Sequence, residues 1–302
     1  MANFGVILPT TNTKQTPREL VGFAVRAEDL GYDSVWVGDT LLRPVLEPLT
    51  TLAAVSSVTS RVTLGTAALL PAFRSPVQAA QTLASLDLLS GGRLTVTVGA
   101  GFPGRSEPEY AMSGVPWANR FTRLDETVRL WRRLWTSDEP VSFHGKVLRF
   151  DDVPPVARPV QPGGPRIWLG GATPRALART AALYDGWLPY PPNPADYAPG
   201  LAAVRADGRD VTAALFATVL ITTSAEEGQA ALAEYTQTNY GVPLEIAKTI
   251  QFLTAGPPEH VRDQLVPYLK AGAEHVVLRI AALDIGVQRD QLAQIAELTA
   301  RL

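Results

Sequence analysis

The chain contains no cysteine and only three histidines among its 302 residues. The lack of cysteine excludes disulfides, a thiolate nucleophile and every cysteine-based metal site. The histidines, His144, His260 and His275, are scattered along the sequence, which excludes a histidine-rich metal centre. We therefore predict that no metal ion is bound.

Neither sign of charge dominates, since 27 lysines and arginines face 29 aspartates and glutamates, for a formal net charge of −2. A nucleic-acid-binding protein would need a basic excess, so nucleic acid is excluded as a partner. No apolar run reaches the length of a membrane span, and the first residues show no basic segment before an apolar stretch of signal-peptide length. These absences predict a soluble, cytoplasmic protein.

What the chain does have is a regular alternation of short apolar strands and helices, in a sequence that is 46% hydrophobic. Strands are expected at residues 4–8, 34–37, 62–65, 94–98, 167–169, 186–188, 215–221 and 276–280. Helices are expected at residues 17–30, 48–58, 76–89, 121–135, 174–184, 225–239 and 287–301. Strands with continuous apolar runs, each followed by a helix, indicate a parallel sheet covered on its outer face. Eight such units predict an α/β fold, a (β/α)8 TIM-like barrel that forms a single domain over residues 1–302, with a doubly wound open sheet as the alternative.

Three segments are too long for plain connections, namely residues 102–120, 136–165 and 190–200. The second is expected to contain a hairpin at residues 141–150, with its turn near Gly145. Long loops in a compact domain are usually functional, and a barrel builds its active site from loops at the carboxyl ends of the strands. We therefore expect loop insertions at that face of the barrel.

The segment from Arg166 to Arg175 carries the strongest local pattern. A predicted buried strand at 167–169 runs directly into Gly170 and Gly171, and Thr173 can then cap a helix that begins at Pro174. Free backbone N–H groups and the positive end of the helix dipole favour an anion at such a place. The pattern indicates a phosphate site, and the alternative is a tight strand–helix turn without a ligand.

Seven motifs, the last of which lies inside this segment, occur in one order along nearly the whole chain. They are Trp36-Val-Gly-Asp39, Leu64-Gly-Thr-Ala-Ala68, Leu89-Ser-Gly-Gly-Arg-Leu94, Val98-Gly-Ala-Gly101, Arg123-Leu-Asp-Glu126, Arg158-Pro-Val-Gln-Pro162 and Leu169-Gly-Gly-Ala-Thr173. Together they resemble the luciferase-like monooxygenase superfamily. That family includes monooxygenases that use flavin mononucleotide (FMN) and oxidoreductases that use the deazaflavin coenzyme F420.

The resemblance implies a TIM-like barrel with F420 or FMN at its C-terminal mouth. It also implies a cis peptide bond behind the coenzyme ring, best matched by Ala67–Ala68, with an ordinary trans bulge as the alternative. The coenzyme phosphate is expected at Gly170 to Thr173. The full set of implied coenzyme contacts is Leu8, Asp39, Thr66, Ala67, Ala68, Gly99, Ala100, Gly101, Gly170, Gly171, Ala172, Thr173 and Trp187.

Candidate catalytic residues are all carboxylates. Asp39 follows a buried strand and is expected to hold the ring or orient a water, or else to be a structural carboxylate. In some deazaflavin-dependent members a histidine follows this aspartate, whereas here the next residue is Thr40, which argues against a sugar-phosphate or alcohol dehydrogenase of that type. Glu107 and Glu109 lie in the loop after the fourth strand, where the family often contacts substrate, although a solvated acidic loop is the alternative.

Three functions follow from the resemblance. The first is an oxidoreductase in which reduced F420 transfers hydride to a small organic substrate. The alternatives are a reduced-FMN monooxygenase, supplied by a separate coenzyme reductase, and a flavin-binding relative without catalysis. The resemblance further implies a homodimer. Oxygen consumption distinguishes the first two functions, because a deazaflavin reacts poorly with oxygen.

Overall fold

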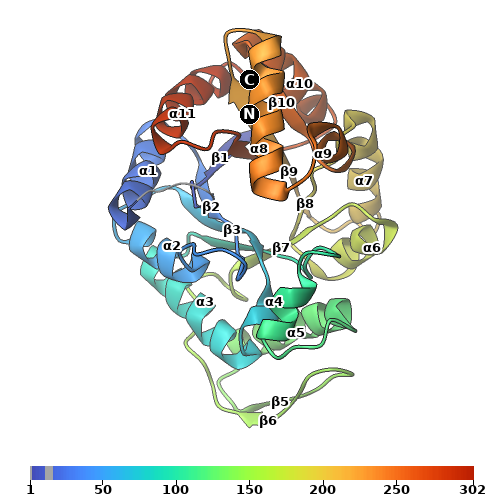
Figure 1. Cartoon of the computed structure of the whole chain (residues 1–302). Coiled ribbons are helices and arrows are strands. Elements are labelled where there is room, and N and C mark those ends of the chain that lie inside the picture. The colour runs from blue at the N-terminus through green and yellow to red at the C-terminus, as the bar shows by residue number, and fades with distance from the viewer. Residues whose placement is uncertain (1, 11–15) are drawn as a thin grey trace. The chain divides into compact units, whose positions relative to one another are not determined.

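The computed structural model describes residues 2–10 and 16–302 (Figure 1). The chain divides into two compact units. The first unit holds Met1–Trp36, Arg61–Thr63 and Trp168–Leu302, and the second holds Val37–Ser60 and Leu64–Ile167. The single domain expected from the sequence stays a prediction, and each unit is described by itself below.

The strand order is that of a (β/α)8 barrel. Eight strands follow one another as β1, β2, β3, β4, β7, β8, β9 and β11, and β11 pairs with β1 to complete the ring. Their bounds are Asn3–Ile7, Ser34–Val37, Thr63–Leu69, Leu94–Val98, Arg166–Gly170, Gly186–Leu188, Thr212–Ile221 and His275–Ile280. These are the eight strands predicted from the sequence, with ends that differ by at most three or four residues. The closed order confirms the barrel and shows that the open-sheet alternative is wrong.

One strand was not predicted. β10 (Leu253–Gly256) pairs in parallel with the last four residues of β9, from Thr218 to Ile221. It is only four residues long and ends in glycine, so its sequence shows neither an apolar run nor an alternation long enough to indicate a strand.

Seven helices occupy the segments expected for them. They are α1 (Pro17–Asp29), α2 (Pro48–Ser56), α3 (Pro76–Ser90), α5 (Arg120–Thr136), α6 (Pro174–Leu183), α8 (Ala225–Tyr240) and α11 (Ile285–Thr299). Four of these begin with proline at the first position, where its missing N–H costs nothing. In the second unit α2, α3 and α5 lie side by side (Figure 1).

Further helices lie in segments where no helix bounds were predicted. They are α4 (Glu107–Met112), α7 (Tyr197–Val204), α9 (Leu244–Ile250) and α10 (Pro258–Lys270), together with the 3₁₀ turns η1 (Pro71–Phe73) and η2 (Pro194–Asp196). Within residues 2–10 and 16–302, no helix has the length and apolar character needed to cross a membrane.

The predicted hairpin is present as β5 (Val141–His144) and β6 (Arg149–Val153), which pair antiparallel. A buried carboxylate on α5 holds its turn. The two oxygens of Glu126 accept hydrogen bonds of 2.6–3.0 Å from the backbone N–H groups of Lys146, Val147 and Leu148. Gly145 lies against the same carboxylate, where a Cβ would overlap it.

Polar and aromatic side chains fill one face of the sheet in the first unit. The Trp36 indole N–H donates to Ser34 Oγ at 2.7 Å, and Ser34 Oγ lies 2.9 Å from His275 Nε2. The Trp168 ring lies 5.2 Å from that of Trp36 and 5.3 Å from His275. Gly5 lies against this cluster, and a Cβ at this position would overlap Ser34 Oγ and Trp36 Nε1.

Burial of His275 predicts a loss of stability in acid. Burial lowers the pKa of His275 to about 4, whereas an unfolded histidine titrates near 6.5. As the pH falls below about 6.5 the unfolded chain binds a proton that the folded chain does not, so the folded state loses stability. We expect the free energy of unfolding to fall by about 2 kcal/mol between about pH 7 and pH 5 because of this group, by denaturant titration.

The His275→Gln variant should lose this part of the pH dependence. His144→Gln is the comparison for the change of residue type, because His144 lies exposed on the hairpin beside Asp151. Equal slopes in the wild type and in His275→Gln would show that His275 titrates normally in the folded protein.

Candidate functional site

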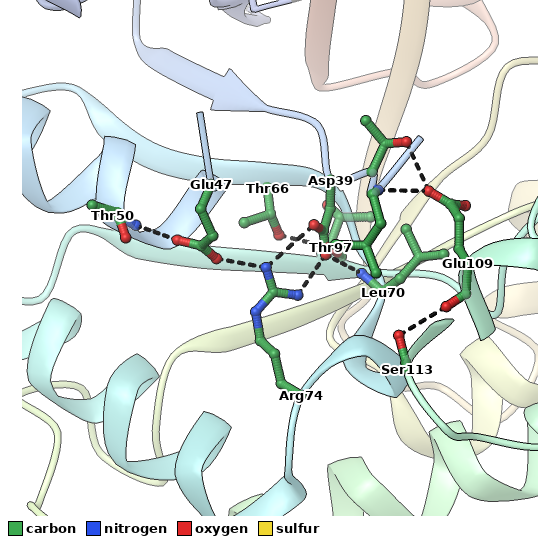
Figure 2. A network of polar contacts seen from close by, with 11 residues as sticks. Asp39, Glu47, Thr50, Thr66, Leu70, Arg74, Thr97, Glu109 and Ser113 are labelled. Carbon is green, nitrogen blue, oxygen red and sulfur yellow. Dashed lines mark hydrogen bonds and ion pairs between the residues drawn. The ribbon is translucent and has the colours of Figure 1, made fainter. Parts of the chain in front are cut away.

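In the second unit, the carboxylate of Asp39 follows the end of β2 and is engaged on both oxygens (Figure 2). Oδ2 accepts from the Leu70 backbone N–H at 3.0 Å and from Arg74 Nη1 at 2.6 Å, and Oδ1 accepts from Arg74 Nη2 at 3.2 Å. The side chain of Asp39 is 2% exposed. Arg74 also reaches Glu47, whose carboxylate accepts from the Thr50 N–H at the start of α2.

In this network, the contacts between Asp39 and Arg74 oppose the effect of burial on the pKa of each group. Burial raises the pKa of Asp39 above its ordinary value, against the lowering effect of Arg74 and of the Leu70 N–H. Burial alone would lower the pKa of Arg74, but its contacts with Asp39 and Glu47 raise it. These contacts favour the interpretation of Asp39 as a structural carboxylate, because each of its two oxygens already has a protein donor.

Glu109 is a second buried carboxylate, 3% exposed, on α4. Its Oε1 accepts from the Thr40 hydroxyl at 2.7 Å and from the Leu41 N–H at 2.8 Å. Among the described residues, Oε2 makes no hydrogen bond with another side chain or with the backbone. Glu109 therefore has one oxygen anchored to the segment after β2 and one oxygen free for a ligand.

Thr40, which stands where some family members have histidine, thus orients a carboxylate. The sequence singled out Glu109 in the loop after the fourth strand and Thr40 directly after Asp39, but it did not predict their contact, because they lie 69 positions apart. Glu107 does not join this group. It lies two positions before Glu109 on the same helix, where side chains do not face each other, and its Oε2 is buried without a hydrogen-bond partner among the described residues.

Small residues line the ends of β3 and β4. The Ala67–Ala68 peptide bond is cis, as expected, so the alternative of a trans bulge is wrong. Ala67, Ala68 and Gly99 are partly exposed, and a Cβ on Gly99 would meet only the Ala68 methyl group, at 3.6 Å. A surface without side chains beyond Cβ lets a planar ring approach the backbone closely, so this patch fits the ring of a flavin or deazaflavin.

The other predicted contacts of the second unit point into the protein. Thr66 is fully buried and its hydroxyl donates to the Thr97 carbonyl at 2.9 Å. Ala100 is buried, and its carbonyl accepts from the Tyr110 hydroxyl at 2.9 Å. Gly101 has φ of +79°, and a Cβ there would overlap Ser106. These residues shape the strand ends through their backbone.

In the first unit, the predicted phosphate loop has the expected form. β7 ends at Gly170, and the Thr173 hydroxyl caps α6 by accepting from the Ala176 N–H at 3.2 Å. Within the part of the chain that the structure describes, the backbone N–H groups of Gly171, Ala172 and Thr173 donate no hydrogen bond. Three free amides at a capped helix N-terminus are a donor set that fits a phosphate.

Trp187 supports this loop from behind. Its indole N–H donates to the Gly171 carbonyl at 2.8 Å, and the side chain is 1% exposed. The ring packs against Tyr197, 5.1 Å away, and over Gly200. Trp187 was expected to contact the coenzyme, whereas its contacts place it as a positioning residue for Gly171. Leu8 is likewise buried, and its N–H donates to the Trp36 carbonyl.

The first unit also has a concave surface lined by Gly22, Phe23, Arg26, Arg289 and Asp290. It lies between α1 and α11, in the helical layer, and holds none of the predicted site residues. Among residues 2–10 and 16–302, no cluster of three histidine, aspartate or glutamate side chains could hold a metal ion.

The chain is similar to known proteins along most of its length. The family model described as luciferase-like monooxygenase matches residues 2–275. An F420-dependent glucose-6-phosphate dehydrogenase of Kribbella flavida is 34% identical over 299 residues, covering 87% of this chain and 88% of that protein. A protein of the same description from Amycolatopsis mediterranei is 41% identical over 182 residues, 57% of this chain, and the match spans 53%, about half, of its length.

Among solved structures, the monooxygenase RslO1 from Streptomyces bottropensis superposes with a TM-score of 0.81 at 22% identity, covering 99% of both chains. At 22% identity the similarity is evidence for the fold alone, and it confirms the barrel.

Proposed function

The chain belongs to the luciferase-like monooxygenase family, and from that premise we propose that it is an oxidoreductase in which reduced coenzyme F420 transfers hydride to a small organic substrate. The observation that carries the proposal is the small-residue patch of Ala67, Ala68 and Gly99 in the same unit as an anchored carboxylate with one free oxygen, Glu109. The choice of F420 is supported by the F420-dependent relatives. Bound coenzyme would supply the hydride, and the protein would supply orientation and proton transfer.

Glu109 is the residue we propose for proton transfer. Reduction of an unsaturated substrate requires a proton as well as a hydride, and the donor must be held in place. Thr40 and the Leu41 N–H fix Oε1 and leave Oε2 to exchange a proton with the substrate. Asp39, paired with Arg74, would hold the end of β3 in shape. Because Thr40 replaces histidine, the glucose 6-phosphate activity of the named relatives is not extended to this chain.

The coenzyme phosphate is proposed to bind the amides of Gly171, Ala172 and Thr173. Gly171 has φ of +100°, so a larger residue there would strain the backbone whether or not phosphate binds. Thr173→Asp is a better test, because aspartate caps a helix as well as threonine but places a negative charge at the loop. We expect coenzyme affinity to fall about tenfold or more, corresponding to about 1.4 kcal/mol of repulsion, with unchanged thermal stability.

The matched control is Ser224→Asp, the same change at the N-cap of α8, where Ser224 accepts from the Glu227 N–H. It should leave coenzyme affinity unchanged. Binding of riboflavin, which lacks the phosphate, should be equal in the wild type and in Thr173→Asp. An unchanged affinity of Thr173→Asp for the phosphorylated coenzymes would place the phosphate elsewhere.

The proposed function is tested by titrating the protein with F420 and with FMN side by side, followed by absorbance. Tighter binding of F420 and reoxidation of reduced F420 without oxygen consumption are expected. Tighter binding of FMN with oxygen uptake would instead support the monooxygenase alternative. Coenzyme binding without any turnover, across a panel of unsaturated substrates, would support the non-catalytic alternative.

Three further expectations extend this proposal. We propose that the protein is cytoplasmic and that it is a homodimer, as the family resemblance implies. A separate reductase would regenerate the reduced coenzyme. Sedimentation of a stable monomer at micromolar concentration would contradict the dimer.

A further inference from the structure

Arg279 lies near the carboxyl end of β11 and was not among the predicted site residues. In the parallel pairing of β9 and β11 it stands opposite Thr218, and Val277 and His275 lie on the same side of β11, two and four positions earlier respectively. His275 faces Ser34 and Trp36, so Arg279 shares the face of the sheet that they line. Active sites of (β/α)8 barrels form at this end of the strands.

The guanidinium of Arg279 has only neutral partners. Nη1 donates to the Tyr240 hydroxyl at 3.0 Å, and the group lies 4.9 Å from the centre of the Phe216 ring. Among the described residues, no carboxylate lies within ion-pair distance of Arg279. A cation that is partly withdrawn from water normally has an anionic partner, because transfer of a charge out of water is costly.

The neighbouring phenol shows the effect of this uncompensated charge. Burial alone would raise the pKa of Tyr240, but the Arg279 charge and the hydrogen bonds of Gln251, Arg279 and Tyr235 lower it. Tyr190 also lies close enough for its charge to influence that of Tyr240. The groups at the cation are thus the two phenols of Tyr240 and Tyr235 and the Phe216 ring, and Tyr190 and Gln251 lie next to Tyr240.

A hydroxyl on the same face also lacks a partner. Thr218 is fully buried, and its Oγ1 makes no hydrogen bond with any described residue. It stands opposite Arg279 on β9 and two positions after Phe216, so the three side chains share one face. Arg279, Tyr190, Tyr240 and Gln251 are only partly buried, which leaves the group open to a ligand.

We propose that Arg279, Tyr240 and Thr218 form a subsite that binds an oxyanion of the substrate, either a carboxylate or a phosphate. The planar guanidinium has five N–H donors, of which the contacts with Tyr240 and Tyr235 use two, and it pairs with both kinds of oxyanion through two parallel hydrogen bonds. The Thr218 hydroxyl would donate to the same group. The assignment to the substrate rests on the proposed function, whereas binding of the oxyanion does not.

Binding is tested first without coenzyme. Inorganic phosphate and acetate are titrated separately into the wild type and the Arg279→Met variant by calorimetry. The control is Arg262→Met, which removes an exposed arginine of α10 and the same net charge. We expect at least a tenfold loss of affinity in Arg279→Met and none in Arg262→Met, and the tighter of the two probes identifies the class of oxyanion.

A spectroscopic measurement reports on the same place. A bound oxyanion would compensate Arg279 and raise the pH at which Tyr240 ionises, seen as phenolate absorbance, and Tyr240→Phe should abolish this shift. If Arg279→Met fails to fold, Arg279→Lys keeps the charge, loses the paired hydrogen bonds and should bind several-fold more weakly.

Two results would overturn the proposal. One is equal binding of both probes by the wild type and Arg279→Met, or no binding by either. The other is a loss of F420 or FMN affinity in Arg279→Met as large as the loss of probe affinity, which would assign the oxyanion to the coenzyme. The probe titrations contain no coenzyme, so their result does not depend on whether the enzyme uses F420. The oxyanion subsite and the proposed function can therefore be refuted independently.

Discussion

Glu109→Gln should lower the single-turnover rate of hydride transfer by about 10²–10⁴-fold, the usual contribution of a general acid or base. The amide oxygen of glutamine can still accept from the Thr40 hydroxyl and the Leu41 N–H, so the loop should stay in place. What is lost is the exchangeable proton at the free oxygen. The rate is measured by stopped-flow absorbance of reduced F420, and coenzyme affinity should change by no more than a few-fold.

Two variants give the comparison its meaning. Thr40→Val removes one of the two hydrogen bonds to Oε1 and should cost less than Glu109→Gln. Glu139→Gln makes the same change at an exposed carboxylate of the same unit and should have no effect. Near-normal turnover in Glu109→Gln would show that Glu109 serves only to hold the segment after β2.

Arg74→Met should destabilise the protein by about 3 kcal/mol at neutral pH, because it leaves the Asp39 carboxylate buried with the Leu70 N–H as its single donor. Burial already raises the pKa of Asp39, and loss of Arg74 removes the main opposing influence. A carboxyl whose folded pKa is raised costs stability as the pH rises above its unfolded pKa, near 3.9. The deficit should therefore shrink in acid, and denaturant titrations at two pH values measure it.

The double variant Asp39→Asn/Arg74→Met should recover much of the lost stability, because no buried charge remains. Arg158→Met is the matched control, since the Arg158–Asp138 pair is 58% and 83% exposed and should contribute less than about 1 kcal/mol. A double variant whose deficit equals the sum of the deficits of Asp39→Asn and Arg74→Met would mean that Asp39 and Arg74 are not coupled.

Local patterns predicted the barrel because each of its strands and helices depends on residues that lie close together in the sequence. The apolar run of β4 and the proline that opens α3 needed no tertiary information, and both were placed within a residue. The form of the loop from Gly170 to Thr173 was predictable for the same reason, since strand, glycines and cap follow one another directly. β10 was not predicted because its four residues, which end in glycine, are too few to show a periodic pattern.

The contacts that define the candidate site could not be read in this way. Asp39 meets Arg74 35 positions away, and Thr40 meets Glu109 69 positions away, so no local pattern links them. The role of Trp187 stayed open between a pocket wall and a structural aromatic, because the residue type is equally suited to both. Its contact with the Gly171 carbonyl depends on the pairing of β7 with β8. Arg279 gave no sequence pattern, since a single charge in an apolar strand shows nothing of its partners.

The cluster around Gly5 constrains how this chain can change over generations. A side chain at position 5 has no room while serine occupies position 34 and tryptophan occupies position 36. A relative that carries alanine or a larger residue at the first position should therefore carry smaller side chains at the other two. Since His275 lies against Ser34, its identity should follow as well. The four positions should thus be inherited as a correlated set, with single-step intermediates that fold poorly and are rare among surviving sequences.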